Sequence, residues 1–213
     1  MKKNKIILLI GREHLEKDSY LYKTILSEIK GIRLDVFSET SWPFLSKFYQ
    51  NMIQIIPKLI RKKPMIQFIY TNIEERFYSA ILNSSDYKLR VAFQKNPNDI
   101  SLRVEKLSKR LHKIPSHIEI TLIGRSAGAI VATLVSLKHP IDKIIALGYP
   151  FKHPDLDDEA YRYEHIKHVK TPMLVIQGLQ DVYGGKEIET KYLFNVHTKL
   201  VFEDINHDFE LTE

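Results

Sequence analysis

The chain of 213 residues contains no cysteine. This absence excludes disulfides, thiolate zinc sites, iron–sulfur clusters and a cysteine nucleophile. Glycine and proline are also few, at 8 and 9 residues, so the chain is neither collagen-like nor dominated by linkers. With 44% hydrophobic and 27% charged residues, the composition is that of one ordinary globular domain. Any chemistry must therefore use oxygen or nitrogen groups.

Long apolar runs are absent as well. No run approaches the roughly 18 apolar residues that a transmembrane helix requires, so no transmembrane segment is expected. The apolar run Ile6–Ile10 near the N-terminus is shorter than the core of a secretory signal, and no small-residue cleavage site follows it. These features favour an intracellular, cytoplasmic location.

Positive charge is concentrated in the first half of the chain. Residues 1–115 contain 22 Lys and Arg against 11 Asp and Glu, whereas residues 116–213 contain 10 against 15. Such asymmetry marks some nucleic-acid-binding or membrane-binding surfaces, although a solvated basic face on helices is the commoner explanation. No specific nucleic-acid motif accompanies it. A weak contact of the basic segment 44–63 with an anionic surface is therefore only an alternative.

Short apolar runs alternate with helical patterns along most of the chain. Strands are predicted at residues 5–10, 32–37, 118–123, 143–147, 173–177 and 199–202, and helices at 18–29, 100–112 and 127–137. This alternation predicts an α/β fold with a mostly parallel central sheet of about six strands and helices on both faces.

Residues 38–98 have a different pattern, in which aromatic and basic residues interleave and Pro57 and Pro64 break a mainly helical stretch. We expect a single domain over residues 1–213, with 38–98 as a helical insertion or lid-like segment before the strand at 118–123. Its aromatic residues are candidates for a ligand-binding wall, although an added helical layer without ligand contacts is equally compatible. They are Phe44, Phe48, Tyr49, Phe68, Tyr70, Phe77 and Tyr78.

A G-x-S-x-G sequence at Gly124–Gly128 lies between a predicted buried strand and a predicted apolar helix. This motif forms a sharp turn that exposes a serine hydroxyl above the end of a strand. A tight turn that merely happens to contain serine is the alternative. The strand–turn–helix context favours Ser126 as a nucleophile.

A serine nucleophile needs a base, and the base needs a carboxylate that holds its tautomer. Asp181 follows the strand 173–177, and His207 follows the strand 199–202. Because the C-terminal ends of parallel strands meet at one edge of a sheet, these side chains should converge with Ser126. Such chemistry requires neither a metal nor a cofactor, and none is expected.

Other polar residues compete for these roles. His14 and His153 also follow strand ends, and Asp204 and Asp208 flank His207, but neither acid has the strand-end position of Asp181. An acidic loop could bind a cation, but a solvated turn explains it better, because its spacing matches no ligand motif. Its residues are Asp155, Asp157 and Asp158.

Four segments carry a resemblance to a known family: Ile123–Val135, Ile144–Pro154, Tyr163–Gly185 and Ile205–Phe209. They resemble the small α/β hydrolases related to dienelactone hydrolase. Within these, the chain is most similar to a bacterial hydrolase-like subgroup that also includes a subunit of a nuclear histone-acetyltransferase complex. The resemblance implies an α/β-hydrolase fold with Ser126 as nucleophile, His207 as general base and then acid, and Asp181 as the orienting carboxylate.

The resemblance also implies an oxyanion hole formed by the backbone N–H groups of Ala127 and Arg12. Relatives tend to have a His-Gly or glycine-rich sequence after the first strand, and Gly11-Arg12-Glu13-His14 departs from it. The candidates for lining the substrate site are His14, Arg125, Tyr149, Phe44 and Phe48. The side chain of Arg125 either meets an anionic substrate or turns away into a salt bridge.

Two functions follow from these expectations. The first is a serine hydrolase that acts on a small-molecule carboxylic ester or thioester through an acyl-serine intermediate. The alternative is a catalytically weak or silent hydrolase fold that acts as a binding or scaffold module. The unusual Arg12-Glu13 loop, the basic insertion and the protein-interaction role known in the subgroup motivate this alternative.

Overall fold

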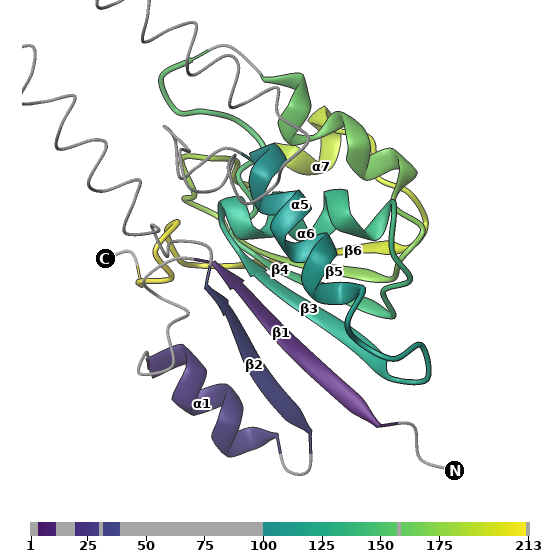
Figure 1. Cartoon of the computed structure of the whole chain (residues 1–213). Helices are drawn as coiled ribbons and strands as arrows, with labels where there is room; N and C mark the ends of the chain where they lie inside the picture. The colour runs from purple at the N-terminus through teal and green to yellow at the C-terminus, as the bar shows by residue number, and fades with distance from the viewer. Residues whose placement is uncertain (1–3, 12–19, 30–31, 39–99, 157–158, 212–213) are drawn as a thin grey trace, which may run out of the picture. The chain divides into compact units, whose positions relative to one another are not determined.

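The computed structural model describes residues 4–11, 20–29, 32–38, 100–156 and 159–211 (Figure 1). The chain divides into two compact units, and all of these residues belong to the unit formed by residues 1–39 and 100–213. The other unit spans residues 40–99 and lies outside the described residues. The predicted insertion with Phe44 and Phe48 therefore stays a prediction, as do the roles of Arg12 and His14.

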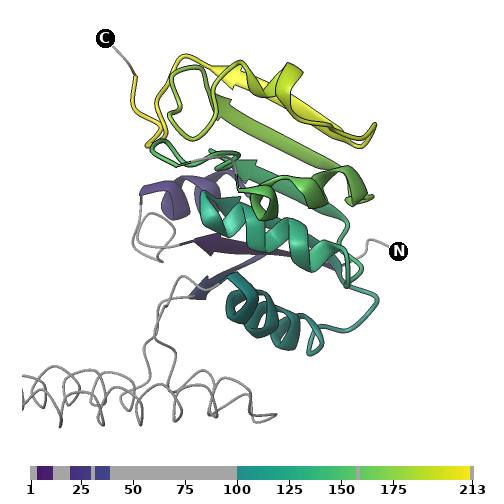
Figure 2. The ribbon, with the colours of Figure 1, turned by 90° about the horizontal axis from the view of Figure 1, so that it is seen from above.

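Six strands form one sheet in the order β2-β1-β3-β4-β5-β6. Every neighbouring pair is parallel, and Figure 2 shows the strands side by side from β2 to the yellow β6. The predicted α/β architecture with about six parallel strands is thus confirmed. The strands are β1 (Lys5–Gly11), β2 (Arg33–Ser38), β3 (Glu119–Arg125), β4 (Lys143–Leu147), β5 (Met173–Gly178) and β6 (Thr198–Glu203).

Helices cover both faces of the sheet. The described helices are α1 (Tyr20–Glu28), α5 (Ile100–Leu111), α6 (Ala127–Ser136), α7 (Ile188–Lys191) and the 3₁₀ helices η2 (Ala160–Arg162) and η3 (Glu164–His168). Helices α5, α6, α7 and η3 bury apolar residues in one cluster, and α1 contacts a second cluster across the sheet. In the described ranges, no helix combines the length and apolar character needed to cross a membrane.

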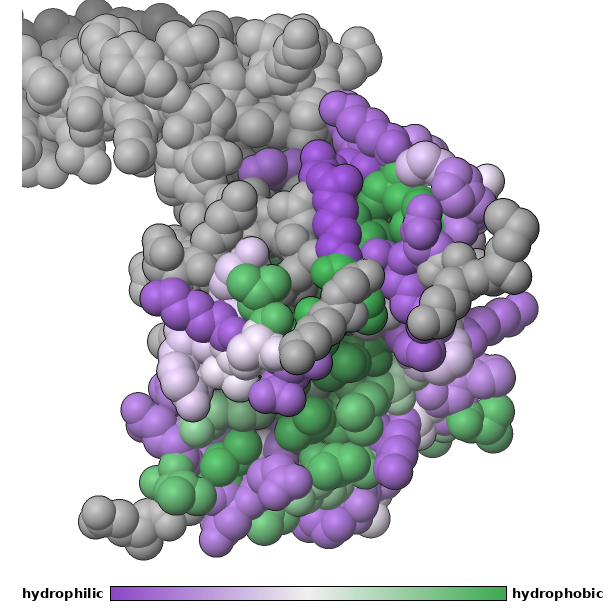
Figure 3. All heavy atoms as spheres, turned by 90° about the horizontal axis from the view of Figure 1, so that it is seen from below, coloured by the Kyte–Doolittle hydropathy of each residue, from purple (hydrophilic) through white to green (hydrophobic). Residues whose placement is uncertain are grey.

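Strand β1 is buried on both faces because it lies between β2 and β3 under both helical layers. Its apolar side chains alternate between the two clusters, with Leu8 and Ile10 in one and Ile7 and Leu9 in the other. A continuous apolar run is typical of such a parallel strand. Apolar side chains also reach the surface, where hydrophilic residues surround them on the face seen from below (Figure 3).

The turn between β3 and α6 is tighter than the sequence predicts. We expected the strand to end at Ile123, but β3 continues to Arg125, and α6 begins at Ala127. Ser126 alone makes the reversal. The reason is that strand β3 extends to the residue before the serine and helix α6 begins at the residue after it. No loop residues remain between the two elements.

The two glycines of the motif permit this tight packing. A Cβ atom on Gly128 would lie 2.2 Å from the carbonyl oxygen of Ile10, and one on Gly124 would lie 2.5 Å from the Cα of Ala129. Both contacts are with backbone, which cannot move aside cheaply. Helix α6 therefore approaches β1 and β3 only because both positions lack a side chain.

A buried polar network joins α6 to η3 behind the sheet. The hydroxyl of Thr133 lies 2.7 Å from His165 Nε2, and the fully buried Tyr149 donates its hydroxyl hydrogen to the carbonyl of Arg162 at 2.6 Å. Burial raises the pKa of the Tyr149 phenol and lowers the pKa of His165 to about 4. The prediction that Tyr149 lines a substrate site is therefore wrong, because its ring belongs to the core.

Substitution Gly128→Ala should lower the free energy of unfolding by about 3 kcal/mol or more, because the new methyl group overlaps the Ile10 carbonyl and separates α6 from β1. Urea denaturation measures the change. Lys138→Ala, at an exposed position just after α6, is the control and should change stability by less than about 0.5 kcal/mol. Equal stabilities of the two variants would contradict the close approach.

The partly buried His165 should make stability fall in acid. Its folded pKa of about 4 lies below the ordinary value of 6.5, so between these pH values the unfolded chain binds a proton that the folded chain excludes. Stability should therefore fall by about 3 kcal/mol from pH 6.5 to pH 4 through this group. Denaturant unfolding at several pH values across this range measures the effect. The unfolding free energy should depend less steeply on pH for His165→Gln than for wild type. His168→Gln, an exposed change on the same helix, is the matched control.

Candidate active site

Ser126 lies at the reversal between β3 and α6 in a strained backbone conformation. Its φ of 50° and ψ of −127° are unfavourable for a residue with a side chain. Two hydrogen bonds hold it there, because its N–H donates to the Leu147 carbonyl at 2.9 Å and its carbonyl accepts from the Ala129 N–H at 2.8 Å. The turn therefore presents the hydroxyl in a fixed position.

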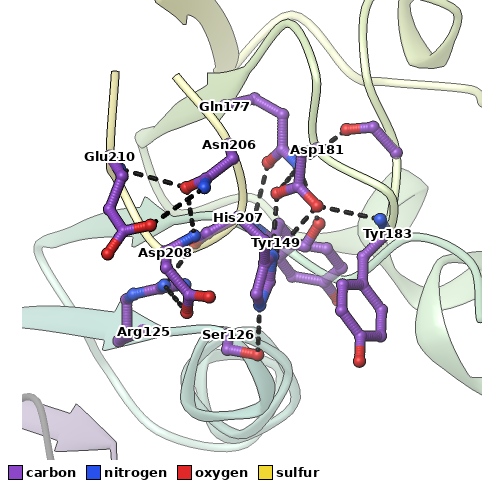
Figure 4. A network of polar contacts seen from close by, with 11 residues as sticks. Arg125, Ser126, Tyr149, Gln177, Asp181, Tyr183, Asn206, His207, Asp208 and Glu210 are labelled. Atoms are coloured by element: carbon purple, nitrogen blue, oxygen red, sulfur yellow. Dashed lines mark hydrogen bonds and ion pairs between the residues drawn. The ribbon is translucent and has the colours of Figure 1, made fainter. Parts of the chain in front are cut away.

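Ser126, His207 and Asp181 lie in one chain of polar contacts (Figure 4). The Nε2 atom of His207 is 3.1 Å from Ser126 Oγ, and its Nδ1 atom is 2.8 Å from Asp181 Oδ2. Ser126 follows β3, Asp181 follows β5 and His207 follows β6, so the C-terminal edge of one sheet supplies all three side chains. The structure thus brings together the three residues that the sequence singles out.

The carboxylate of Asp181 is fully buried, whereas the imidazole of His207 retains 16% exposure. Besides His207, the carboxylate accepts the backbone N–H of Tyr183 at 2.8 Å and the side-chain amide of Gln177 at 2.8 Å. Both oxygens therefore have donors, as a buried acid requires. These contacts fix the orientation of the carboxylate relative to His207.

Gln177 is a supporting residue that the sequence analysis missed. It is fully buried at the end of β5, where its amide nitrogen donates to Asp181 and to the Gly184 carbonyl at 2.7 Å. Its amide oxygen accepts the backbone N–H of Tyr149 at 2.8 Å. The available signal was a single polar residue closing the otherwise apolar run Met173–Ile176.

Tyr183 is a second missed residue, two positions after Asp181. Its ring lies over the imidazole of His207 with centroids 4.4 Å apart and planes inclined by 46°. The ring therefore restricts the rotation of the imidazole on one side. His153, a competing candidate, lies beyond this ring at 6.3 Å from its centroid and accepts the N–H of Asp155 through Nδ1.

The side chain of Arg125 turns toward the residues around His207. Its side chain is 8% exposed and forms an ion pair of 3.5 Å with Asp208. The guanidinium also donates to the backbone carbonyl of His207 and lies 4.9 Å from the ring centroid of Phe209. The prediction that Arg125 lines the substrate site is corrected in favour of the salt-bridge alternative, and Asp208 is accounted for by this pair.

Ala127 is the first residue of α6, so its N–H has no acceptor within the helix. It directly follows Ser126 and belongs to the positive end of the helix dipole. No acceptor for this N–H lies among the described residues, so a negative oxygen beside Ser126 would meet an available donor. The second expected donor, Arg12, lies outside the described residues.

Comparison with known proteins agrees with the observed fold. The family model described as "Alpha/beta hydrolase domain" matches residues 66–213, well over half of the chain. The chain belongs to the alpha/beta hydrolase family. No curated protein sequence matches it.

Solved structures of other proteins share the fold of this alpha/beta hydrolase. A serine hydrolase homologue from Coxiella burnetii aligns with a TM-score of 0.54 at 14% identity, over 97% of this chain and 77% of that one. An esterase from Pyrococcus furiosus aligns with a TM-score of 0.52 at 15% identity, over 96% and 75%. An alpha/beta-superfamily protein from Xanthomonas campestris pv. campestris aligns with a TM-score of 0.51 at 16% identity, over 98% of this chain and 89% of that one. At such identities the likeness establishes the fold alone.

Removing the Gln177 amide should destabilise this alpha/beta hydrolase. Gln177→Leu leaves the Tyr149 N–H without its buried acceptor and removes one of the two donors to Asp181 Oδ2, which should cost about 3 kcal/mol of unfolding free energy. Chemical denaturation followed by circular dichroism measures this loss. Gln180→Leu breaks an exposed contact with Asp204 and is the matched control, expected to cost less than about 1 kcal/mol. A neutral Gln177→Leu would show that the carboxylate does not need this support.

Proposed function

We propose that the protein is a serine hydrolase that cleaves carboxylic esters or thioesters through an acyl-Ser126 intermediate. One observation carries the proposal: Ser126 Oγ, His207 and the buried Asp181 form an unbroken hydrogen-bonded chain with separations of 3.1 and 2.8 Å. This is the arrangement in which an imidazole can take the serine proton while a carboxylate stabilises the resulting imidazolium.

Acylation begins when Ser126 Oγ attacks the acyl carbon and His207 Nε2 takes the hydroxyl proton. The acyl oxygen becomes an oxyanion, for which the Ala127 N–H is the first donor and the loop containing Arg12 is the proposed source of the second. Collapse of the tetrahedral species breaks the bond to the leaving alcohol or thiol, which receives the proton from His207. Asp181 accepts the Nδ1 hydrogen throughout and holds the required tautomer.

Deacylation repeats these steps with water as the nucleophile. His207 takes a proton from water, hydroxide adds to the acyl carbon, and the tetrahedral species expels Ser126, which recovers its proton from His207. One ester and one water thus become one acid and one alcohol, or a thiol for a thioester. No step requires a metal or an organic cofactor.

The substrate class follows from the preference of an alkoxide nucleophile for acyl groups with good leaving groups. The Pyrococcus furiosus relative is named as an esterase, which supports the ester assignment. The resemblance to dienelactone hydrolases and to the bacterial hydrolase-like subgroup points to a small substrate. His14 is the residue that we propose for its binding wall.

A weak or silent hydrolase fold that binds a partner is the second candidate. Gly11-Arg12-Glu13-His14 replaces the glycine-rich sequence found after the first strand in relatives, at the place where the second oxyanion donor belongs. Loss of one such donor lowers the rate by about 10²- to 10³-fold. Recovery of a stoichiometric partner, together with no turnover of short- or long-chain p-nitrophenyl esters, would favour this candidate.

A fluorophosphonate probe tests the hydrolase proposal. Wild type should be labelled on Ser126, and Ser126→Ala should not be labelled. Asp181→Asn should slow labelling by roughly 10³- to 10⁴-fold, because the imidazole loses its correct tautomer. Ser136→Ala, which changes the last residue of α6, should label like wild type. A folded wild type that resists the probe, or equal labelling of Ser126→Ala, would refute the proposal.

A further inference from the structure

We infer that Arg125, the residue before the nucleophile, is a positioning residue that holds His207 in reach of Ser126. This inference rests on the proposed function, since it concerns how the proposed base is held. It goes beyond the Ser-His-Asp contacts because Arg125 touches none of the three functional side-chain groups. Its partners are instead the backbone of His207 and the two residues that follow it.

The contacts of Arg125 converge on the turn that carries His207 (Figure 4). The guanidinium donates to the His207 carbonyl, pairs with Asp208 at 3.5 Å, and lies 4.9 Å from the Phe209 ring centroid. One planar group therefore contacts three successive residues. A guanidinium suits this role because its donors form a rigid fork and its face can stack on an aromatic ring.

The turn itself is held by local contacts and by strand β5. The Asn206 side chain accepts the N–H groups of Asp208 at 2.9 Å and Glu210 at 3.0 Å, which closes the turn on itself. The N–H of Gln180 donates to the Ile205 carbonyl, which ties the start of the turn to the loop after β5. Arg125 supplies a tie from the centre of the turn to β3, the strand that leads into Ser126.

This tie links the two reacting partners directly. Arg125 is covalently attached to Ser126, so a contact from its side chain to the His207 backbone fixes the histidine relative to the serine. A stabilising residue elsewhere in the core would not fix His207 relative to Ser126 in this way. A misplacement of about 1 Å between reacting groups can reduce a rate by about 100-fold.

Stability alone gives a poor account of this arginine. Its side chain is 92% buried, and its Nη1 atom has no hydrogen-bond partner among the described residues, which leave part of the cost of desolvating the guanidinium uncompensated. Well-packed apolar side chains often replace buried ion pairs without loss of stability. A charged group in this position is therefore better explained by where it holds His207.

The test measures fluorophosphonate labelling of Ser126 as a maximal rate, kinact, and a half-saturating concentration, KI. Arg125→Met should lower kinact by about 10- to 100-fold and change KI by less than about twofold, because the base is misplaced while the probe site is kept. Arg125→Lys retains one cationic donor without the fork and should give an intermediate kinact. Arg162→Met is the matched control, since Arg162 is another largely buried arginine, paired with Glu159 at 2.5 Å, and it should label like wild type.

Each outcome decides between separate claims. If wild type is labelled and folded Arg125→Met has the same kinact, the inference is overturned and the hydrolase proposal stands. A folded wild type that does not label would overturn both. If Arg125→Met fails to fold, Arg125→Lys decides: a reduced kinact at constant KI supports the inference, and a wild-type kinact overturns it.

Discussion

The close approach of helix α6 to the sheet is the constraint on which the rest of the site depends. Gly124 and Gly128 remove the side chains that would otherwise collide with the backbone of α6 and β1. With the helix this close, one residue must make the whole reversal from strand to helix. Ser126 does so at a φ of 50°, and the strain is held by hydrogen bonds to Leu147 and Ala129.

Once Ser126 is fixed at the end of β3, the parallel sheet determines where its partners can lie. Strands β4, β5 and β6 end at the same edge, and the loops after β5 and β6 carry Asp181 and His207. Buried amides then set the finer geometry. Gln177 orients the carboxylate from inside the sheet, while Tyr183 restricts the imidazole from outside. The site is therefore a rigid edge with one partly exposed histidine.

Much of the fold could be predicted from the sequence, because apolar periodicity reports burial directly. The strand at 143–147 has the observed limits, and the other five predicted strands and the helices predicted at 18–29, 100–112 and 127–137 differ by one or two residues at their ends. The short helices η2, η3 and α7 were not predicted. The convergence of Ser126, Asp181 and His207 was also predictable, since strand-end position follows from chain order in a parallel sheet.

Side-chain direction was not predictable from the same patterns. Tyr149 follows a strand end as Asp181 does, yet its ring turns into the core and its phenol reaches Arg162. Arg125 is adjacent to Ser126, yet its guanidinium turns toward the His207 turn. Gln177 looked like the last residue of an apolar strand, yet its amide bonds the backbone of Tyr149 and Gly184 and the carboxylate of Asp181. Such contacts arise from tertiary packing, which spacing along the chain does not encode.

The acyl-enzyme itself offers the most direct test of the account. Wild-type protein mixed with excess p-nitrophenyl butyrate, quenched with acid within milliseconds to seconds and analysed by mass spectrometry, should carry one butyryl group on the peptide containing Ser126. The adduct should form at the rate at which the first equivalent of p-nitrophenolate appears, as acyl-serine chemistry requires. Turnover without any adduct on Ser126, or the same turnover in Ser126→Ala, would contradict the account.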